Sequence, residues 1–226
     1  MNRPVNPPRH RRSRGSLTRA QVVEAALRLA DEEGLEALSM PTLAGRLQCG
    51  VMTLYGYIHD KQDLLDAIAQ QGLADLRLPR PLPTGPAAAL VAWGRALRST
   101  LLEHPSLPVI FVSHTVIGPG IFHGIEALLG ALDRAGMYPS AGLHAIYAVL
   151  IYTTGFVAWE RPRTRRQAEA VYAAQWRREF ARLPPEQLPM TASVVDELPR
   201  VASAEQFELG LTALAEGLTR AAAKRR

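Results

Sequence analysis

The segment RLPRPLPTGP, residues 77–86, limits the possible folds more than any other part of the sequence. Proline lacks a backbone N–H donor and its ring collides with the preceding turn, so no regular helix can run through the four prolines of this segment. Helical patterns lie on both sides of it. The chain is therefore predicted to be all-α and divided, with a small helical unit before the segment and a larger helical bundle after it.

Two capped helices are predicted at the start of the small unit. Thr18 and Gln21 form a capping box, in which each side chain satisfies a backbone N–H at the beginning of a helix. The helical spacing of apolar residues continues until Gly34, a residue typical of helix ends. Ser39 is a good N-cap for a second, shorter helix, and Pro41 is tolerated in its first turn.

A tight turn and two further helices complete the small unit. After the turn Gln-Cys-Gly, a short helix is predicted over residues 51–58, where Leu54 and Ile58 share one face. Asp60 is placed to cap the helix that follows. A helix, a tight turn and a second helix at the centre of a small helical unit are typical of a helix-turn-helix.

The larger unit is predicted to be a helical bundle. Residues 108–117 have strand propensity, but no second strand is evident to pair with them, so a short helix or a buried loop is predicted there. A proline-rich loop over residues 183–203 precedes a last helix, in which Gly210 and Gly217 permit the close approach of a neighbour. The other bundle helices are predicted over residues 87–103, 121–135 and 143–161.

Composition restricts the class of protein. The most hydrophobic run, residues 143–159, is short for a membrane span and contains polar residues, so it is predicted to be a buried helix. No apolar stretch typical of a signal peptide follows the arginine-rich start. The single cysteine, Cys49, excludes an internal disulfide, and a reducing cytoplasm fits. No Cys/His pair has zinc-ligand spacing, and neither a metal nor a cofactor is expected.

Catalytic motifs are not evident. The six histidines are dispersed, and no serine or cysteine lies in a recognisable nucleophile motif. The stretch GPGIFHG departs from the dinucleotide-binding fingerprint because His123 occupies its sixth position. An enzyme is therefore not expected.

The first 17 residues are basic, although the net charge of the whole chain is only +5. They contain no acidic residue and suit a polyanion, whose phosphates release counterions when arginines approach. A solvated leader that binds nothing is the alternative. The arginines of this arm are Arg3, Arg9, Arg11, Arg12 and Arg14.

The segment MTLYGYIHDK, residues 52–61, carries candidate contact groups. If the apolar positions of its helix face the core, Met52, Thr53, Tyr55 and Tyr57 occupy the remaining circumference. Tyrosine and threonine hydroxyls can bond phosphate oxygens, and the threonine methyl can touch a thymine methyl. Lys61 adds a cation at the start of the next helix. The alternative is that the two tyrosines only cover the edge of the core.

Residues from about 18 to 68 resemble the DNA-binding domain of the TetR family of bacterial repressors. The resemblance rests on the capped first helix and on the stretches LSMPTLAGRL, TLYGYI and DKQDLL. Gln48 stands where a glycine is usual, Gly50 where a serine or threonine commonly caps the recognition helix, and Tyr57 where a histidine is usual. The DNA contacts that the residues and the resemblance predict are Arg14, Thr42, Val51, Met52, Thr53, Tyr55, Tyr57 and Lys61.

The rest of the chain is similar to the C-terminal domain of the tetracycline-repressor branch, through LLEHP, ALDRAGMYP and FELGLTALAEGL. This resemblance implies a ligand-binding bundle that dimerises through the helices near residues 140–160 and 204–223. The branch's metal-binding histidine is not matched, because an ungapped match puts Phe111 or Val112 there and His114 lies two or three positions away. Tetracycline and magnesium are therefore not carried over.

Large side chains in the bundle, with Thr153 among the few polar groups, suit a mostly apolar effector pocket. By resemblance, an effector bound near residues 111–114 would act on the helix over residues 60–77 and move the two DNA-reading helices of a dimer out of register. Dense core packing is the alternative for any one of these side chains. The predicted effector residues are Trp93, Phe111, His114, Phe122, Tyr147, Ile151, Phe156 and Trp176.

The expected architecture is an N-terminal three-helix helix-turn-helix DNA-binding domain followed by a C-terminal helical bundle for ligand binding and dimerisation. The predicted boundaries are a basic arm over 1–17, the DNA-binding domain over 18–77, a proline-rich linker over 78–86 and the bundle over 87–226. The expected function is a cytoplasmic repressor that binds a palindromic operator as a homodimer and is released by a small hydrophobic effector. A non-catalytic helical protein-interaction module is the alternative, and an enzyme is a more remote one.

Overall fold

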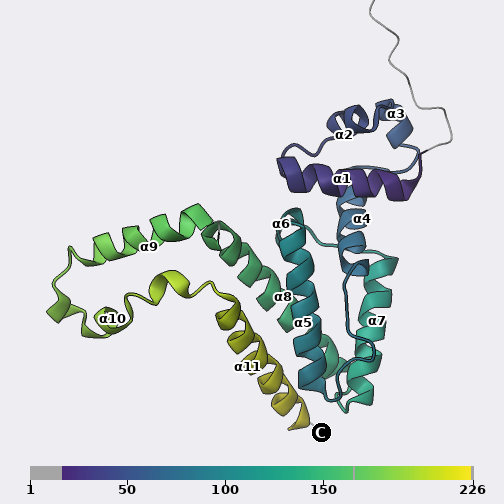
Figure 1. Ribbon diagram of the computed structural model, residues 1–226. Coiled ribbons are helices and arrows are strands. Elements are labelled where there is room, and N and C mark those ends of the chain that lie inside the picture. Colours follow the sequence, from purple (N-terminus) through teal and green to yellow (C-terminus); the bar gives the residue numbers. More distant parts are fainter. Residues whose placement is uncertain (1–16, 165, 225–226) are drawn as a thin grey trace, which may run out of the picture.

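Helices and connecting turns make up the computed structural model, which describes residues 17–164 and 166–224 (Figure 1). No strand occurs among these residues, and the predicted all-α class is confirmed. Two short 3₁₀ helices, η1 (Pro185–Gln187) and η2 (Leu198–Arg200), flank α10. The α-helices are α1 (Arg19–Glu33), α2 (Met40–Leu47), α3 (Val51–Leu54), α4 (Lys61–Ala74), α5 (Pro86–Glu103), α6 (Ser106–Ser113), α7 (Pro119–Arg134), α8 (Pro139–Thr164), α9 (Arg166–Phe180), α10 (Pro189–Val194) and α11 (Ala204–Ala223).

Local side-chain bonds start the helices of the small unit where the sequence predicts them. Both hydrogen bonds of the capping box are present, from Thr18 N to Gln21 Oε1 at 2.9 Å and from Gln21 N to Thr18 Oγ1 at 3.2 Å. Ser39 and Asp60 each accept a hydrogen bond from the backbone N–H three residues later, and so cap α2 and α4. Gly34 ends α1 with a φ of 88°.

The third helix is shorter than predicted, because α3 ends at Leu54 rather than near Ile58. The chain tightens after it, and the Gly56 N–H bonds to Thr53 O at 3.2 Å. A β-carbon at Gly56 would lie only 3.2 Å from the same oxygen, so this turn suits glycine. Leu54 and Ile58 are buried as predicted.

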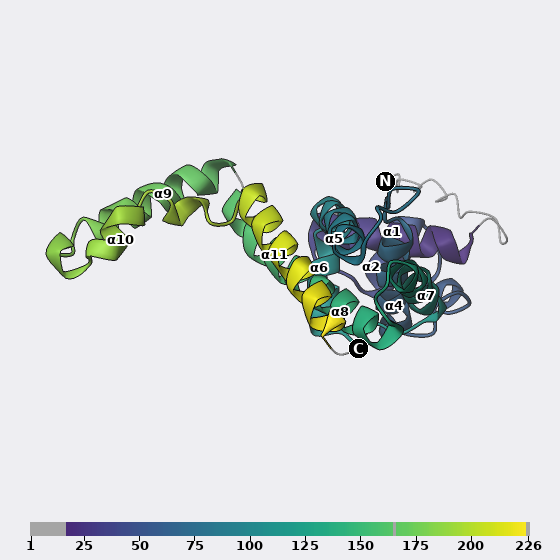
Figure 2. The same cartoon turned by 90° about the horizontal axis from the view of Figure 1, so that it is seen from below.

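The bundle contains the predicted helices and two that the sequence patterns did not indicate, α9 and α10. The stretch over residues 183–203, predicted to be a proline-rich loop, contains α10 and the two 3₁₀ helices, so that prediction was wrong. The stretch over residues 108–117 forms part of α6 and the loop after it, which confirms the short helix. The helix α9 was not anticipated, because it has good helix formers but no clear apolar stripe. Figures 1 and 2 show that α9 and α10 extend away from the rest of the bundle.

The central helix α8 is long and apolar. Its segment Pro139–Glu160, with a mean hydropathy of 1.5, satisfies the length and composition of a membrane span. However, α8 packs against α5, α7 and α11, and Ala145, Val149 and Val157 are buried in these contacts. Burial explains only one side of its apolar character, because Leu143, Tyr147 and Ile151 on the same helix are exposed; the predicted buried helix is therefore buried on one side only.

The last helix, α11, approaches α5 and α8 closely at two points. Gly94 of α5 leaves space for the Leu211 side chain, and Gly210 leaves space for the Tyr152 ring, because a β-carbon at either glycine would overlap that side chain. No described atom stands within 4 Å of a β-carbon placed at Gly217. The predicted close approach is therefore present at Gly210 and wrong for Gly217 within this chain.

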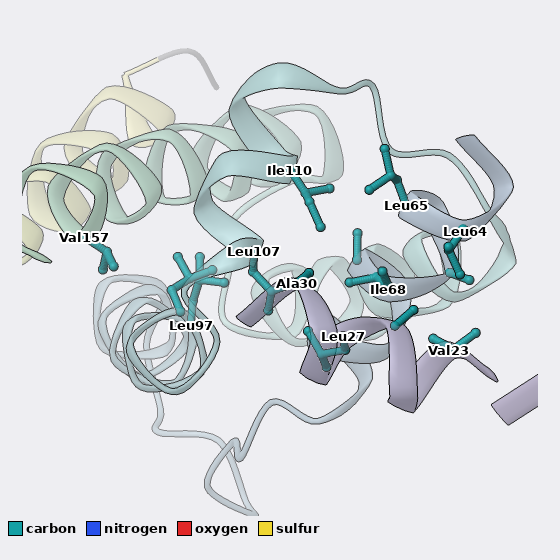
Figure 3. Close-up of a cluster of buried hydrophobic side chains, with 14 of the residues drawn as sticks. Val23, Leu27, Ala30, Leu64, Leu65, Ile68, Leu97, Leu107, Ile110 and Val157 are labelled. Carbon is teal, nitrogen blue, oxygen red and sulfur yellow. The ribbon is translucent and has the colours of Figure 1, made fainter. Parts of the chain in front are cut away.

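A continuous hydrophobic core joins the small unit to the bundle (Figure 3). Leu27 and Ala30 of α1, Ile68 of α4 and Leu107 of α6 are all buried in it. Gly72 of α4 makes room for Leu107, whose side chain a β-carbon at position 72 would overlap. The small unit is therefore packed onto the bundle through α1 and α4.

Candidate DNA-binding surface and effector site

The helix-turn-helix is formed by α2, a short turn and α3. Gln48 ends α2 in the left-handed region, with φ 53° and ψ 39°. This conformation explains why a glycine is usual at the position, since a side chain there costs about 1 kcal/mol. The turn is nevertheless closed by a hydrogen bond from Cys49 N to Ala44 O at 3.0 Å. The departure at Gln48 thus leaves the helix-turn-helix geometry intact.

The short helix α3 presents several exposed side chains above a buried one. Leu54 is fully buried, whereas 81% of Met52 is exposed. Thr53 and Tyr55 are exposed as well. Neighbouring apolar and hydroxyl-bearing groups on so short a helix form a surface on which a partner can bind.

The two tyrosines of this region occupy different environments. Tyr55 is exposed. Tyr57 is half-buried and packs against the hydrophobic core, as does Val51. Tyr57 therefore covers the core edge in addition to any contact that its hydroxyl makes.

The beginning of α4 lies beside this surface and is held in position by Asp63. The carboxylate of Asp63 accepts a hydrogen bond from Arg19 Nη2 at 2.6 Å and so connects α4 to α1. Lys61 is exposed in the first turn of α4, and Thr42 is exposed in the first turn of α2. Arg14 lies outside the described residues.

The loop between α6 and α7 and the first turn of α7 are hydrogen-bonded to α4. Ile117 N donates to Asp66 Oδ1 at 3.4 Å, and Gly120 N donates to Gln70 Oε1 at 3.1 Å. His114 ends α6 at the start of this loop. The backbone after His114 is thus in direct contact with the helix that follows the reading surface.

A second connection links α1 to the beginning of α6. The Asp31 carboxylate accepts hydrogen bonds from His104 Nδ1 at 2.8 Å, from Ser106 N at 3.0 Å and from Ser106 Oγ at 2.7 Å. Sequence reasoning missed this site because the partners lie 73 and 75 residues from Asp31. It stabilises one orientation of α1 relative to the bundle.

The predicted effector residues do not share one environment. Trp93 is buried, and Phe111, His114 and Phe156 are half-buried. The others are exposed, and two of them lie on the same outer face of α8 as Leu143. The exposed residues are Phe122, Tyr147, Ile151 and Trp176.

Two adjacent threonines of α8 are buried without hydrogen-bond partners. The hydroxyls of Thr153 and Thr154 meet no donor or acceptor within the described residues. A buried hydroxyl without a partner costs about 1–3 kcal/mol, so a native structure rarely keeps one without a reason. The sequence indicated Thr153 as a polar group of the bundle but gave no reason to include Thr154.

An aromatic group and an ion pair lie close to these threonines along α8. Phe207 stacks on Tyr152 with a ring-centroid distance of 5.6 Å and packs edge-on against Phe156. The guanidinium of Arg98 lies 4.9 Å from the Phe207 centroid and donates from Nε to Glu160 at 3.1 Å. Burial raises the pKa of Tyr152, whose hydroxyl donates to the Phe207 carbonyl at 3.0 Å.

Two family models match the chain. Residues 22–68 match the model described as bacterial regulatory proteins of the tetR family. Residues 79–222 match the model described as the C-terminal domain of tetracycline-repressor-like proteins.

Proteins of similar sequence include two bacterial regulators. The chain is 36% identical over 149 residues to the HTH-type transcriptional repressor DrrR1 of Streptomyces coeruleorubidus, covering 64% of this chain and 55% of that protein. It is 33% identical over 156 residues to an HTH-type transcriptional regulator of Saccharopolyspora erythraea, covering 68% of this chain and 65% of that protein. The match thus spans less than two thirds of the length of either relative.

A solved structure resembles almost the whole chain. The Streptomyces coelicolor TetR family protein ActR, in complex with actinorhodin, superposes with a TM-score of 0.83 at 27% identity. The superposition covers 94% of this chain and 100% of that chain.

Proposed function

The chain belongs to the TetR family of bacterial regulatory proteins, and on this premise we propose that it is a ligand-responsive transcriptional repressor. In this proposal it binds a palindromic DNA operator in the cytoplasm as a homodimer. The observation that supports DNA binding most directly is the exposure of Met52, Thr53 and Tyr55 above the buried Leu54. The second helix of a helix-turn-helix needs such an outer face to enter the major groove.

The contacts divide into those that position the protein on DNA and those that distinguish bases. Lys61 combines a cation with the N-terminal dipole of α4, a combination that attracts a phosphate. Tyrosine and threonine hydroxyls serve as further phosphate donors. Phosphate contacts are assigned to Thr42, Tyr55, Tyr57 and Lys61, and base-edge contacts to Val51, Met52 and Thr53.

Binding to operator fragments selected from genomic DNA tests this division, with affinity measured at several salt concentrations. Lys61→Ala should weaken binding to all sequences and reduce the slope of log affinity against log salt by about one unit. Lys224→Ala, which removes the other lysine of the chain, is the matched control and should change neither quantity. Thr53→Ala should alter preference at particular bases. If Lys61→Ala and Thr53→Ala lowered affinity equally on every sequence, the division would be wrong. A protein that does not bind DNA would refute the proposed repressor function.

The basic arm is proposed to add phosphate or minor-groove contacts to DNA. Its arginines lie outside the described residues, so the proposal rests on the sequence. Deletion of residues 1–15 should lower operator affinity and reduce its salt dependence. Unchanged affinity and salt dependence would identify the arm as a solvated leader.

The proposed dimer forms through α8 and α11. Leu143, Tyr147 and Ile151 repeat at intervals of four residues and form an exposed apolar stripe on α8. Leu209 is exposed on the neighbouring helix α11. An apolar face shared by two adjacent helices suits an isologous contact with a second copy. Tyr147 and Ile151 are accordingly assigned to this face rather than to the effector pocket.

Analytical ultracentrifugation of a charged variant tests the dimer. Ile151→Glu should shift the protein from dimer to monomer at micromolar concentration, because the interface would then bury an unpaired carboxylate. Val112→Glu places the same charge on an exposed apolar position of α6 and should leave the dimer intact. A monomeric wild-type protein would refute the proposed dimer.

The effector is proposed to be a moderately hydrophobic organic molecule bound inside the bundle. The unpartnered hydroxyls of Thr153 and Thr154 support this proposal, because a ligand acceptor or donor would satisfy them. The solved complex of ActR with a small molecule supports it as well. The loop after His114 and the first turn of α7 contact α4, which provides a path from the bundle to the reading surface.

A compound screen for operator release and for a rise in melting temperature tests the effector site. Thr153→Val and Thr154→Val should leave the ligand-free protein equally or more stable, since each removes an unpartnered buried hydroxyl. The same variants and His114→Ala should weaken release by the compounds found. Unchanged operator release in all three variants would show that the effector binds elsewhere.

A further inference from the structure

The proline-rich linker borders a hollow on the outside of the bundle. The hollow has a volume of about 590 Å³ and lies between residues 76–85, the first turn of α5 and the C-terminal half of α7. Small-molecule sites commonly enclose roughly 300–1,000 Å³. None of the predicted effector residues lines this hollow, so it is separate from the proposed effector site.

Small apolar groups line the hollow on the α7 side. Ala127 and Ala131 share one face of α7, and Ala135, which caps the end of the helix, follows at the same interval of four residues. Ala89 of α5 also lines the hollow. The small alanine side chains and the proline residues of the linker together make up much of its lining. Such a space accepts a flat apolar molecule.

The charged groups that line the hollow are both arginines, Arg80 of the linker and Arg134 of α7. No carboxylate lines it, and neither arginine forms an ion pair within the described residues. The Arg134 guanidinium folds back along its helix, with Nη1 3.4 Å from the position of a β-carbon on Gly130. A guanidinium without a partner offers paired donors that match a carboxylate.

We propose that this hollow is a second small-molecule site and that it binds an aromatic carboxylate. The ring lies against the alanine face of α7, and the carboxylate pairs with the guanidinium of Arg134, while Arg80 adds a second positive charge. The site also contacts Leu76 and Leu78, which follow the end of α4. An occupant therefore bridges the segment after α4 and the helix α7. Binding at this site does not depend on the proposed repressor activity.

Titration of the full-length protein with 2-naphthoate, followed by ligand-observed NMR, tests the proposal. A ligand of this size in an open site should bind with a dissociation constant on the order of 1 mM. Arg134→Gln should weaken binding about tenfold, because it removes a charge-assisted hydrogen bond. Ala131→Phe should abolish binding by covering the alanine face of α7 against which the ring lies. Arg178→Gln, an exposed arginine of α9, removes the same charge elsewhere and should leave binding unchanged.

The neutral analogue 2-naphthalenemethanol separates the charge from the ring. It should bind the wild-type protein about tenfold more weakly than 2-naphthoate does. Its affinity for Arg134→Gln should equal its affinity for the wild-type protein. Arg134 is exposed, so its replacement preserves the fold even if Ala131→Phe does not. Wild-type affinity for 2-naphthoate in Arg134→Gln, equal affinity for both probes, or no binding of 2-naphthoate would each overturn the proposal.

Discussion

Side-chain caps start most helices of the small unit but few of those in the bundle for which the start is described. In the small unit, α1, α2 and α4 each start with a side chain that accepts a hydrogen bond from the backbone three residues later, namely Thr18, Ser39 and Asp60. In the bundle, α5, α6 and α7 start without a side-chain cap, as α3 does in the small unit, whereas Ser203 caps the last helix, α11, in the same way as the small unit's caps. A cap stabilises a helix end by about 1 kcal/mol with no help from the rest of the fold.

The bundle relies instead on contacts between distant parts of the chain. Arg98 and Glu160 are 62 residues apart, and Tyr152 donates to a carbonyl 55 residues away. Both contacts exist only after α5, α8 and α11 have packed together. The comparison indicates that local bonds specify where the small unit's helices begin, whereas non-local bonds hold the bundle in its arrangement.

Removal of the partly buried cation in the bundle should have the largest effect. Arg98→Ala should lower the free energy of unfolding by about 3 kcal/mol, because it leaves the buried Glu160 carboxylate without its partner. Urea denaturation at fixed protein concentration measures the loss. Arg95→Ala breaks the exposed pair with Glu208 and should cost less than about 1 kcal/mol. Equal losses of unfolding free energy in the two variants would show that the buried pair does not hold the bundle more strongly than an exposed one.

The junction of the two regions should show the next largest effect. Asp31→Ala should cost about 2 kcal/mol, because His104 and Ser106 lose a partly buried charged acceptor. Operator affinity should fall as well, since α1 is then less firmly held against α6. Glu24→Ala, which breaks an exposed pair within α1, should change neither quantity by much. A loss no larger than that of Glu24→Ala would show that Asp31 does not join the regions.

Loss of a cap tests the local side of the comparison. Thr18→Ala should lower the free energy of unfolding by about 1 kcal/mol, since the Gln21 N–H loses its acceptor at the start of α1. Thr53→Ala removes an exposed threonine that caps no helix and should cost less than about 0.5 kcal/mol. Thermal unfolding followed by circular dichroism distinguishes the two, and identical melting temperatures would contradict the local role.

The smallest expected effect is a gain in stability at the turn. Gln48→Gly should raise the free energy of unfolding by roughly 0.5 kcal/mol, because glycine adopts the left-handed conformation without the clash of a β-carbon. Gln71→Gly, within α4, should instead cost about 1 kcal/mol. If denaturant titrations showed that both variants lower the free energy of unfolding, the strain at position 48 would be absent.

Much of the candidate DNA-binding surface could be predicted from the sequence. The caps, the buried positions Leu54 and Ile58 and the exposed position of Thr53 follow from residue type and helical spacing. The length of α3 did not follow, because the tightening at Gly56 depends on turn geometry that spacing does not report. The different burial of Tyr55 and Tyr57 did not follow either, since it depends on how that turn leaves the helix.

The effector residues illustrate the limit of sequence reasoning. Large side chains such as Trp93 and Ile151 look equivalent in an apolar helical pattern, yet one is buried and the other is largely exposed. Helical spacing describes which residues share a face. It does not say which face meets a neighbouring helix when several faces are apolar.

By itself, the sequence determined the all-α class and the starts of the capped helices. Each of these depends on interactions within a few residues, such as the bond between Thr18 and Gln21. Only the tertiary structure decided that Arg98 pairs with Glu160, that Asp31 joins α1 to α6, and that the linker borders a hollow with Arg134. These arrangements join residues far apart in the sequence, such as Arg98 and Glu160 at 62 positions and Asp31 and His104 at 73, and helix packing, which the local pattern does not encode, brings them together.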